Sequence, residues 1–302
     1  GEGFRVTVYE HKPSVGRKFL LAGRGGLNLT HTEAIDEFVH HYDATGWVAP
    51  LLAAFGPEDL RAWSASLGEE TFVGSSGRVF PASFRATPLL RAWLRRLDDL
   101  GVEFVTRHRW HGWSDGGGHR FAGPDGSEFD VHADVTVMAL GGASWPRVGS
   151  DGGWVPIFES AGITVTSLRA ANAGVVVDWS SPFVERFAGQ PVKNVAVSVG
   201  TGAAVRGDVV VTGAGLEGGP VYAMGREVRT ELDASGGCTL LIDLHPDQTA
   251  AQLTDRLAIR RSKDSVTTWL RRSIGLHLVA VNLLREAVGA ALPNDAERMA
   301  EL

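Results

Sequence analysis

The chain has 302 residues, 44% of them hydrophobic and 21% charged, and a formal net charge of −6. This length suits two domains, the composition is that of a globular protein, and the acidic balance argues against a nucleic-acid-binding surface. One cysteine, Cys238, excludes an intrachain disulfide, and with no signal peptide we expect a cytoplasmic protein. No apolar run reaches the roughly 20 residues of a membrane helix, so no membrane contact is expected.

The chain opens with a short apolar strand, Val6–Glu10, that ends in an acid. In dinucleotide-binding folds an Asp or Glu closes the second strand and holds the adenosine ribose, about 20 residues after a G-x-G-x-x-G turn. Only nine residues precede Glu10, and residue 1 is Gly rather than Met. We therefore expect a chain cut just before the second strand, with Glu10 as a ribose contact. The alternative is a surface acid.

A glycine-rich loop follows, GRKFLLAGRGGLNLTH at residues 16–31. Its glycines allow close approach of the backbone to a ligand, and Arg17, Lys18 and Arg24 suit a phosphate-bearing ligand. A glycine-rich loop alone is a weak signal. A basic surface loop after a strand is therefore the alternative interpretation.

Helical and extended patterns alternate over the next hundred residues. Residues 32–68 favour three short helices, the third opened by Pro57. Thr87 is expected to cap a longer helix that ends at Gly101. Four strands are then expected, near residues 102–106, 110–114, 120–122 and 129–131.

The segment Val135–Leu140 is nearly all apolar and runs directly into Gly141 and Gly142. Such a run is typical of a buried parallel strand. Open α/β sheets bind ligands beyond the carboxyl ends of their strands, so we expect Glu10, Gly141 and Gly142 to share that edge. Taken alone, this junction fits a plain strand and turn equally well.

The second half of the chain has a different pattern. Short β segments at 175–177, 192–199, 209–211 and 239–242, joined by glycine-rich connections, predict an inserted β-barrel or sandwich. Residues 249–292 favour helices. Their core candidates are Leu253, Leu257, Trp269, Leu270, Leu276, Leu283 and Leu284. We predict three parts, at residues 1–168, 169–247 and 248–302.

Residues 6–31, VTVYEHKPSVGRKFLLAGRGGLNLTH, resemble the second strand and loop of the HI0933-like flavoproteins, a family of FAD-dependent oxidoreductases. The family pattern is G-R-K followed by S-G-x-G-R-C-N-x-T-N. The chain keeps most of it, with Gly26 and Leu27 in place of Arg and Cys. Residues 137–153 and 208–228 resemble further family stretches with substitutions. The resemblance covers nearly the whole chain, but the family continues with a Gly-Glu-x-x-Asp motif that is absent here.

The resemblance implies an α/β fold in which a Rossmann-like FAD-binding domain, lacking its first strand and glycine turn, carries an inserted β domain and a helical subdomain. It implies hydride transfer through FAD on a small molecule, with NAD(P)H as a candidate reductant. The cofactor-binding residues implied in this way are Glu10, Arg17, Lys18, Gly23, Gly26, Leu27, Asn28, Trp110, Gly141 and Gly142. The loop residues would act through backbone and amide groups, and Trp110 stands where relatives contact adenine by backbone. A core tryptophan is the alternative.

Two other classes of function stay open: a non-enzymatic flavin-binding redox or accessory protein, and a fragment without cofactor. We expect the chain as given to come without FAD or with low occupancy. No metal site is expected, because the pairs His40-His41 and His108-His111 lack a third Cys or carboxylate partner in sequence. No residue is assigned as a catalytic acid or base.

Overall fold

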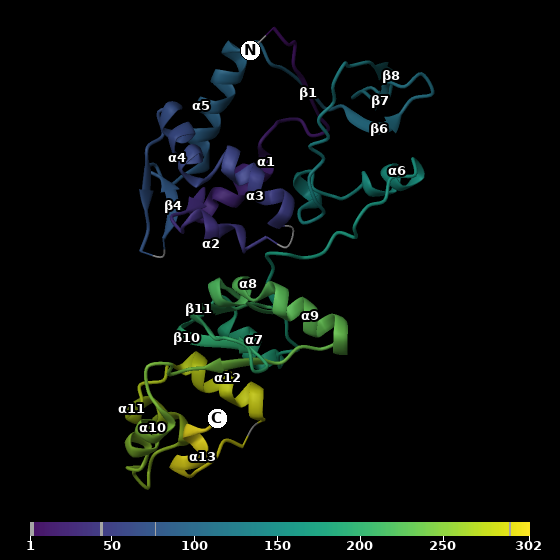
Figure 1. Cartoon of the computed structure of the whole chain (residues 1–302). Helices are drawn as coiled ribbons and strands as arrows, with labels where there is room; N and C mark the ends of the chain where they lie inside the picture. Colours follow the sequence, from purple (N-terminus) through teal and green to yellow (C-terminus); the bar gives the residue numbers. More distant parts are fainter. Residues whose placement is uncertain (1–2, 43–44, 76, 290) are drawn as a thin grey trace. The chain divides into compact units, whose positions relative to one another are not determined.

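The computed structural model describes residues 3–42, 45–75, 77–289 and 291–302. It divides into two compact units, Gly1–Leu168 and Arg169–Leu302, coloured purple to teal and green to yellow in Figure 1. Both units combine helices and sheets, so the expected α/β class is confirmed. The further division after residue 247 stays a prediction. None of the helices within the described residues is both long and apolar enough to cross a membrane.

The first unit is built around a parallel strand pair. β1 (Thr7–Glu10) lies beside β5 (Glu103–Thr106), with Glu10 opposite Thr106. Parallel strands need a long crossover, and the chain between them forms most of the helices of this unit. The crossover contains α1 (Arg17–Ala22), the 3-10 turn Gly23–Gly25, β2 (Thr30–His31), α2 (Ile35–Val39), α3 (Thr45–Ala54), α4 (Pro57–Ser66), β3 (Thr71–Val73), β4 (Arg78–Pro81) and α5 (Ala86–Asp99).

The expected helices of this crossover are confirmed, with Pro57 at the first position of α4. The expected cap of α5 is wrong: its N-cap is Arg85, and Thr87 lies inside the first turn. The helix begins earlier because Ala86 is buried in a cluster with Leu27 and Leu89. Burial of that apolar residue outweighs the hydroxyl cap that Thr87 would offer.

The glycine-rich loop packs closely on α5. A Cβ atom at Gly23 would lie 2.5 Å from the Cβ atom of Ala86, and one at Gly16 would lie 2.6 Å from the Leu90 side chain. Only residues without side chains allow this approach of α1 to α5. At least two of the loop glycines therefore serve the packing of the first unit.

An antiparallel three-stranded sheet follows β5. It consists of β6 (Arg109–Trp113), β7 (His119–Ala122) and β8 (Glu128–Val131). The segment 135–140 after it is not a strand, which corrects our expectation of a buried parallel strand. Val135 and Val137 are 80% and 85% exposed. The segment pairs with no strand of the described residues, so neither its backbone nor its apolar side chains have a sheet to join. The 3-10 turn Pro146–Val148 and α6 (Val155–Ser160) complete the unit.

The second unit contains one five-stranded antiparallel sheet in the order β13-β10-β11-β12-β9. The strands that we expected in a barrel or sandwich thus form a single open sheet. Their bounds are β9 (Val175–Val176), β10 (Pro191–Val199), β11 (Val205–Val211), β12 (Gly215–Gly218) and β13 (Leu240–Asp243). Strand β12 and the helices α7 (Ser181–Phe187), α8 (Gly219–Ala223) and α9 (Gly225–Ser235) were not predicted.

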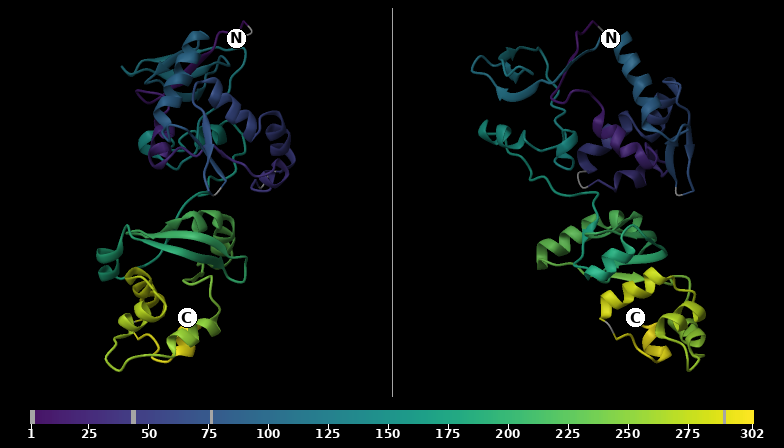
Figure 2. Two further views of the ribbon diagram at one scale, coloured as in Figure 1. Left: turned by 90° about the vertical axis from the view of Figure 1, so that its left-hand side faces the viewer. Right: turned by 180° about the vertical axis from the view of Figure 1, so that it is seen from behind.

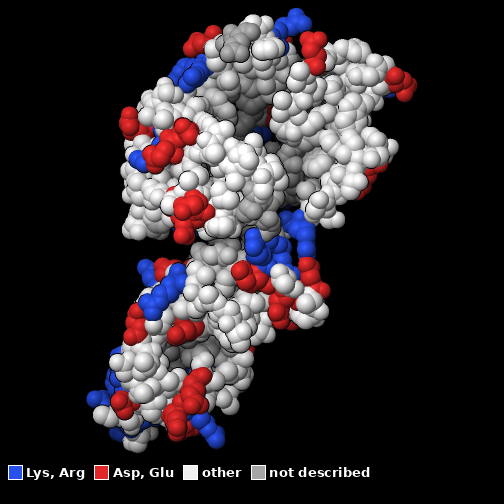
Figure 3. All heavy atoms as spheres, in the orientation of Figure 1, with Lys and Arg blue, Asp and Glu red and all other residues white. Residues whose placement is uncertain are grey.

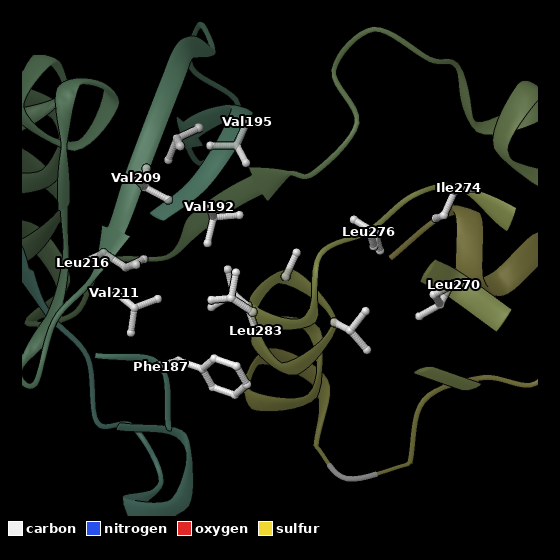
Figure 4. Close-up of a cluster of buried hydrophobic side chains, with 14 of the residues drawn as sticks. Phe187, Val192, Val195, Val209, Val211, Leu216, Leu270, Ile274, Leu276 and Leu283 are labelled. Atoms are coloured by element: carbon white, nitrogen blue, oxygen red, sulfur yellow. The ribbon is translucent and has the colours of Figure 1, made fainter. Parts of the chain in front are cut away.

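Helices lie on both sides of this sheet, as the views in Figures 1 and 2 agree: α8 and α9 on one side and α12 on the other. The C-terminal helices are α10 (Ala250–Leu257), α11 (Val266–Ser273), α12 (Leu278–Val288) and α13 (Ala296–Ala300). Figure 4 shows side chains of the sheet, such as Val211, directed toward Leu283 of α12 and Phe187 of α7. The predicted core residues of the helical part belong to this one cluster, with Leu284 packed at its border.

Candidate functional site

Glu10 ends β1 at the carboxyl edge of the parallel pair. Its carboxylate oxygen Oε1 accepts a hydrogen bond of 2.8 Å from the backbone N–H of Lys12 and lies 3.4 Å from His11 Nδ1. The backbone N–H of His108 donates to the Glu10 carbonyl over 3.1 Å, which ties β1 to the start of the next sheet. Both side-chain contacts use Oε1. The second carboxylate oxygen, Oε2, has no hydrogen bond to the described residues.

A cleft of about 390 Å³ lies beside this strand end, within the size range of small-molecule sites. The end of β1, the first residues of β6 and the segment 140–157 form its walls. The lining residues are Tyr9, His11, His108, Arg109, Trp110, His111, Phe121, Leu140, Gly149, Asp151, Gly153, Trp154 and Ile157. The cleft lies next to Glu10 and the Gly141–Gly142 turn, but these three residues are not among those that line it. Their contact with a cofactor stays a prediction.

Two polar atoms in the walls of this cleft are buried and unsatisfied. They are Nε2 of His11 and Nε1 of Trp110, which find no hydrogen-bond partner among the described residues. Buried polar side-chain atoms in folded proteins are nearly always paired. Two unpaired atoms in one cleft therefore mark it as a place that a polar ligand would complete.

The His11 ring is held in a partly buried position. Burial lowers its pKa below 6.5, the positive charges of Arg109 and Lys12 lower it further, and the carboxylates of Glu10 and Asp151 oppose this. The neutral form of the ring is therefore favoured at pH 7. We did not predict His11 from the sequence. One signal was available. His11 lies two positions after Tyr9, and side chains two positions apart in an extended strand point to the same side.

An ion pair closes one side of the cleft. Arg109 Nη2 lies 3.6 Å from Asp151 Oδ2, and Asp151 Oδ1 accepts a hydrogen bond of 3.0 Å from the Gly153 backbone. The hydrogen bond from Gly153 and the charge of Arg109 hold the pKa of Asp151 below its usual value. The preceding turn also packs here, since a Cβ atom at Gly149 would lie 3.1 Å from the His11 ring.

Lys18 connects the glycine-rich loop to the second glycine turn. Its Nζ donates a hydrogen bond of 2.7 Å to Oγ of Ser144. In that turn the Gly141 carbonyl accepts from Trp154 Nε1 over 3.0 Å, and the Gly142 carbonyl accepts from the Gly152 backbone. Arg17 is exposed and reaches Ser14. The structure thus brings Lys18 to the 141–144 turn, as a shared ligand-binding edge requires.

The remaining predicted residues have varied surroundings. Gly26 lies under the ring of Phe84, which a Cβ atom would approach to 2.4 Å. Leu27 is buried in the core, and Asn28 is exposed. Trp110 lies inside β6, where its ring packs edge-on against Trp113 with the centroids 5.0 Å apart. Contacts of these residues with a cofactor stay a prediction.

The described part of the chain holds no group of three His, Cys, Asp or Glu side chains in metal-binding geometry. His41 contacts Glu33, and His108 hydrogen-bonds to the Thr106 carbonyl. Burial, followed by the charge of Glu231, raises the pKa of the Cys238 thiol, as expected for an inert thiol. On the face drawn in Figure 3, acidic and basic side chains are interspersed.

The chain is similar to known proteins of one family. The pattern of the family described as HI0933-like protein Rossmann domain matches residues 1–266. The chain is also 26% identical over 251 residues to a 3-dehydro-bile acid delta(4,6)-reductase of Clostridium scindens. That alignment covers 82% of this chain and 60% of the relative, so the chain spans less than two thirds of the relative's length.

Proposed function

Because this chain belongs to the HI0933-like protein Rossmann-domain family, we propose that it is an FAD-dependent oxidoreductase acting on a small molecule. One observation carries the proposal. Glu10 stands at the carboxyl end of a parallel strand with one carboxylate oxygen open, beside a cleft with two unsatisfied polar atoms. Dinucleotides bind at this edge of α/β sheets, with an acid on the ribose hydroxyls.

The residues present fit the adenosine half of FAD. The open Oε2 of Glu10 can accept from a ribose hydroxyl, and the cleft offers ring surfaces from Tyr9 and Trp110. Lys18 supplies a positive charge between the two glycine turns, where a phosphate of the cofactor would pass. Flavin, when bound, accepts or gives a hydride, and the protein contributes position and electrostatics.

The Arg109–Asp151 pair positions the wall of the cleft in this proposal. It connects the start of β6 with the turn that leads into α6, so it holds the segment after Gly142 against the strand ends. A fixed wall limits the access of water to the base and ribose, which strengthens their hydrogen bonds. No acid or base for proton transfer is assigned.

The likeness to the bile-acid reductase supports reduction of a conjugated enone as the reaction to try first. A nicotinamide cofactor as reductant and a cytoplasmic location belong to the same proposal. The likeness is partial in length and modest in identity, and the substrate is proposed on the strength of that likeness alone.

The proposal is tested by anaerobic reduction of the protein after addition of FAD. The bound flavin should lose its yellow absorbance with NADH or NADPH, and a steroid enone should restore it over repeated cycles. Flavin that binds but never turns over would instead support the non-enzymatic flavoprotein. A chain with no affinity for FAD would contradict both and would favour the third class, a fragment without cofactor.

A further inference from the structure

We propose that the side chains of His11 and Trp110 recognise the adenine base, His11 as a hydrogen-bond acceptor and Trp110 as a donor. This rests on the proposed function, in which the cleft holds the adenosine half of FAD, and it adds selectivity for the base. From the sequence we expected only a backbone contact at Trp110 and assigned no role to His11.

Trp110 provides a donor in a fixed position. The indole Nε1–H can only donate, and here it is buried without a partner among the described residues. The ring cannot easily turn away, because Trp113 and Phe158 pack edge-on against it with centroids 5.0 and 5.9 Å distant. An acceptor on a molecule in the cleft would satisfy it.

His11 provides an acceptor. Its Nδ1 lies 3.4 Å from the Glu10 carboxylate, which favours the tautomer with the proton on Nδ1. In a neutral ring the other nitrogen, Nε2, is then an acceptor. This atom is buried and unpaired in the same cleft. The charged groups around the ring are Glu10, Asp151, Arg109 and Lys12, and burial is the main reason that the pKa of His11 is low.

One donor and one acceptor match the edge of adenine. Adenine presents an amino donor at position 6 beside the acceptor N7, whereas guanine presents two acceptors, O6 and N7. A base with oxygen at position 6 would place that oxygen against His11 Nε2, so two acceptors would face each other. The cleft should therefore prefer adenine over bases with a 6-oxo group.

The test is calorimetric titration of the 302-residue chain with ADP and with inosine 5′-diphosphate, which carries oxygen at position 6. ADP should bind about tenfold more tightly, because a site built for a hydrogen bond rejects a ligand that cannot make it. His11→Ala should weaken ADP binding and remove most of the preference. Trp110→Phe should weaken ADP binding about threefold to tenfold, the effect of one neutral hydrogen bond.

The matched control is Trp47→Phe, the same replacement at a tryptophan of α3 that is 65% exposed and does not line the cleft. It should leave ADP affinity unchanged within about twofold, because it shares no contact with the proposed ligand. Equal losses in Trp110→Phe and Trp47→Phe, or no preference of the unmodified chain for ADP, would overturn the proposal. The pH dependence of adenosine binding to the unmodified chain gives a reading without any variant, because adenosine carries no phosphate group that titrates near neutral pH. Its affinity should fall as the pH drops through the lowered pKa of His11 and Nε2 gains a proton, and a flat profile would overturn the acceptor role.

Titrations with FAD, FMN and NADH separate this inference from the proposed function. If FAD binds equally to the unmodified chain and to both cleft variants, base recognition fails and the flavin proposal stands. If ADP binds more tightly than inosine 5′-diphosphate and NADH also binds, but FAD does not, base recognition stands and the flavin proposal fails. FMN has no adenine, so any affinity for it should not respond to either variant.

Discussion

The two units of this chain distribute buried and unsatisfied groups differently. The second unit buries one continuous apolar cluster that joins its sheet to the C-terminal helices. The first unit has a much smaller cluster, around Leu27, Ala86 and Leu89, and leaves Val135 and Val137 in solvent. Of the buried side-chain atoms without partners in the described residues, those of His11, Trp110, Ser114 and His119 lie in the first unit, and only that of His245 lies in the second. The large apolar core and most of the unsatisfied polar atoms of the described residues therefore lie in different units.

The largest effect on stability is expected from a substitution in the core of the second unit. Trp269 is 1% exposed, its Nε1 donates to the Leu257 carbonyl, and Arg260 stacks over its ring. Trp269→Ala should cost about 3–5 kcal/mol in the unfolding free energy of that unit. ADP affinity should be unchanged. Urea denaturation followed by circular dichroism measures the first quantity, with the half-exposed Trp145→Ala as control. An equal loss of ADP binding would show that the units do not behave separately.

A medium effect is expected at the contact of α1 with α5 in the first unit. Gly23→Ala places a methyl group 2.5 Å from the Cβ atom of Ala86, so it should cost about 1–3 kcal/mol by overpacking. Gly25→Ala is the control, because a Cβ atom there meets nothing within 4 Å. Thermal unfolding of both variants measures this difference in stability, and Gly23→Ala should have the lower midpoint. Equal midpoints would mean that the packing of the loop on α5 is looser than described.

The pH dependence should differ between the units. The folded-state pKa of His11 lies below its usual value of 6.5, chiefly through burial. Its contribution to the stability of the first unit is therefore present above pH 6.5 and is lost as the pH falls through the lowered value. Asp151, whose pKa is lowered from 3.8, acts only in a more acidic window. Unfolding midpoints measured between pH 7.5 and 5, roughly the range in which histidine titrates, should fall less in His11→Asn than in the unmodified chain. Parallel slopes would contradict the assignment.

The smallest effect is expected in the segment before Gly141. Val137 is 85% exposed, so Val137→Lys should change the unfolding free energy by no more than about 0.5 kcal/mol. The sequence pattern predicted a buried strand, for which a lysine would cost several times more. A large loss of unfolding free energy in Val137→Lys would indicate that residues 135–140 form a buried strand, as the sequence pattern predicted, and would contradict their exposure in the structure. Ala139→Lys, in the same segment, provides a second measurement.

The sequence predicted helices and core residues correctly where the local periodicity of apolar residues agrees with their burial. Trp269 and Leu270 follow a helical pattern and lie in the core, and Pro57 begins its helix as expected. The pattern misled at 135–140, because an apolar run shows that burial is favourable but not whether a neighbouring strand is present to pair with it. β12 was missed because Gly215–Gly218 is dominated by glycine, which carries no strand signal.

The candidate site was predictable in part. Glu10 and the Lys18 region could be located from the strand-end acid and the basic glycine loop. His11 and Asp151 could not, because their roles arise from the meeting of β1, β6 and the 141–153 turn, which are distant in sequence. The packing role of Gly23 was hidden for the same reason, since its partner Ala86 is more than sixty residues away.

The central claim, that the end of β1 holds the adenosine of a dinucleotide, is tested most directly by titrating ADP and FAD into the unmodified chain and into Glu10→Ala. We expect the variant to bind both ligands about tenfold or more weakly, since a hydrogen bond to a charged group contributes about 1.5–3 kcal/mol. Glu103→Ala, an acid on the neighbouring strand at the opposite end of the pair, should bind as the unmodified chain does. Equal affinities for the unmodified chain and Glu10→Ala would contradict the account.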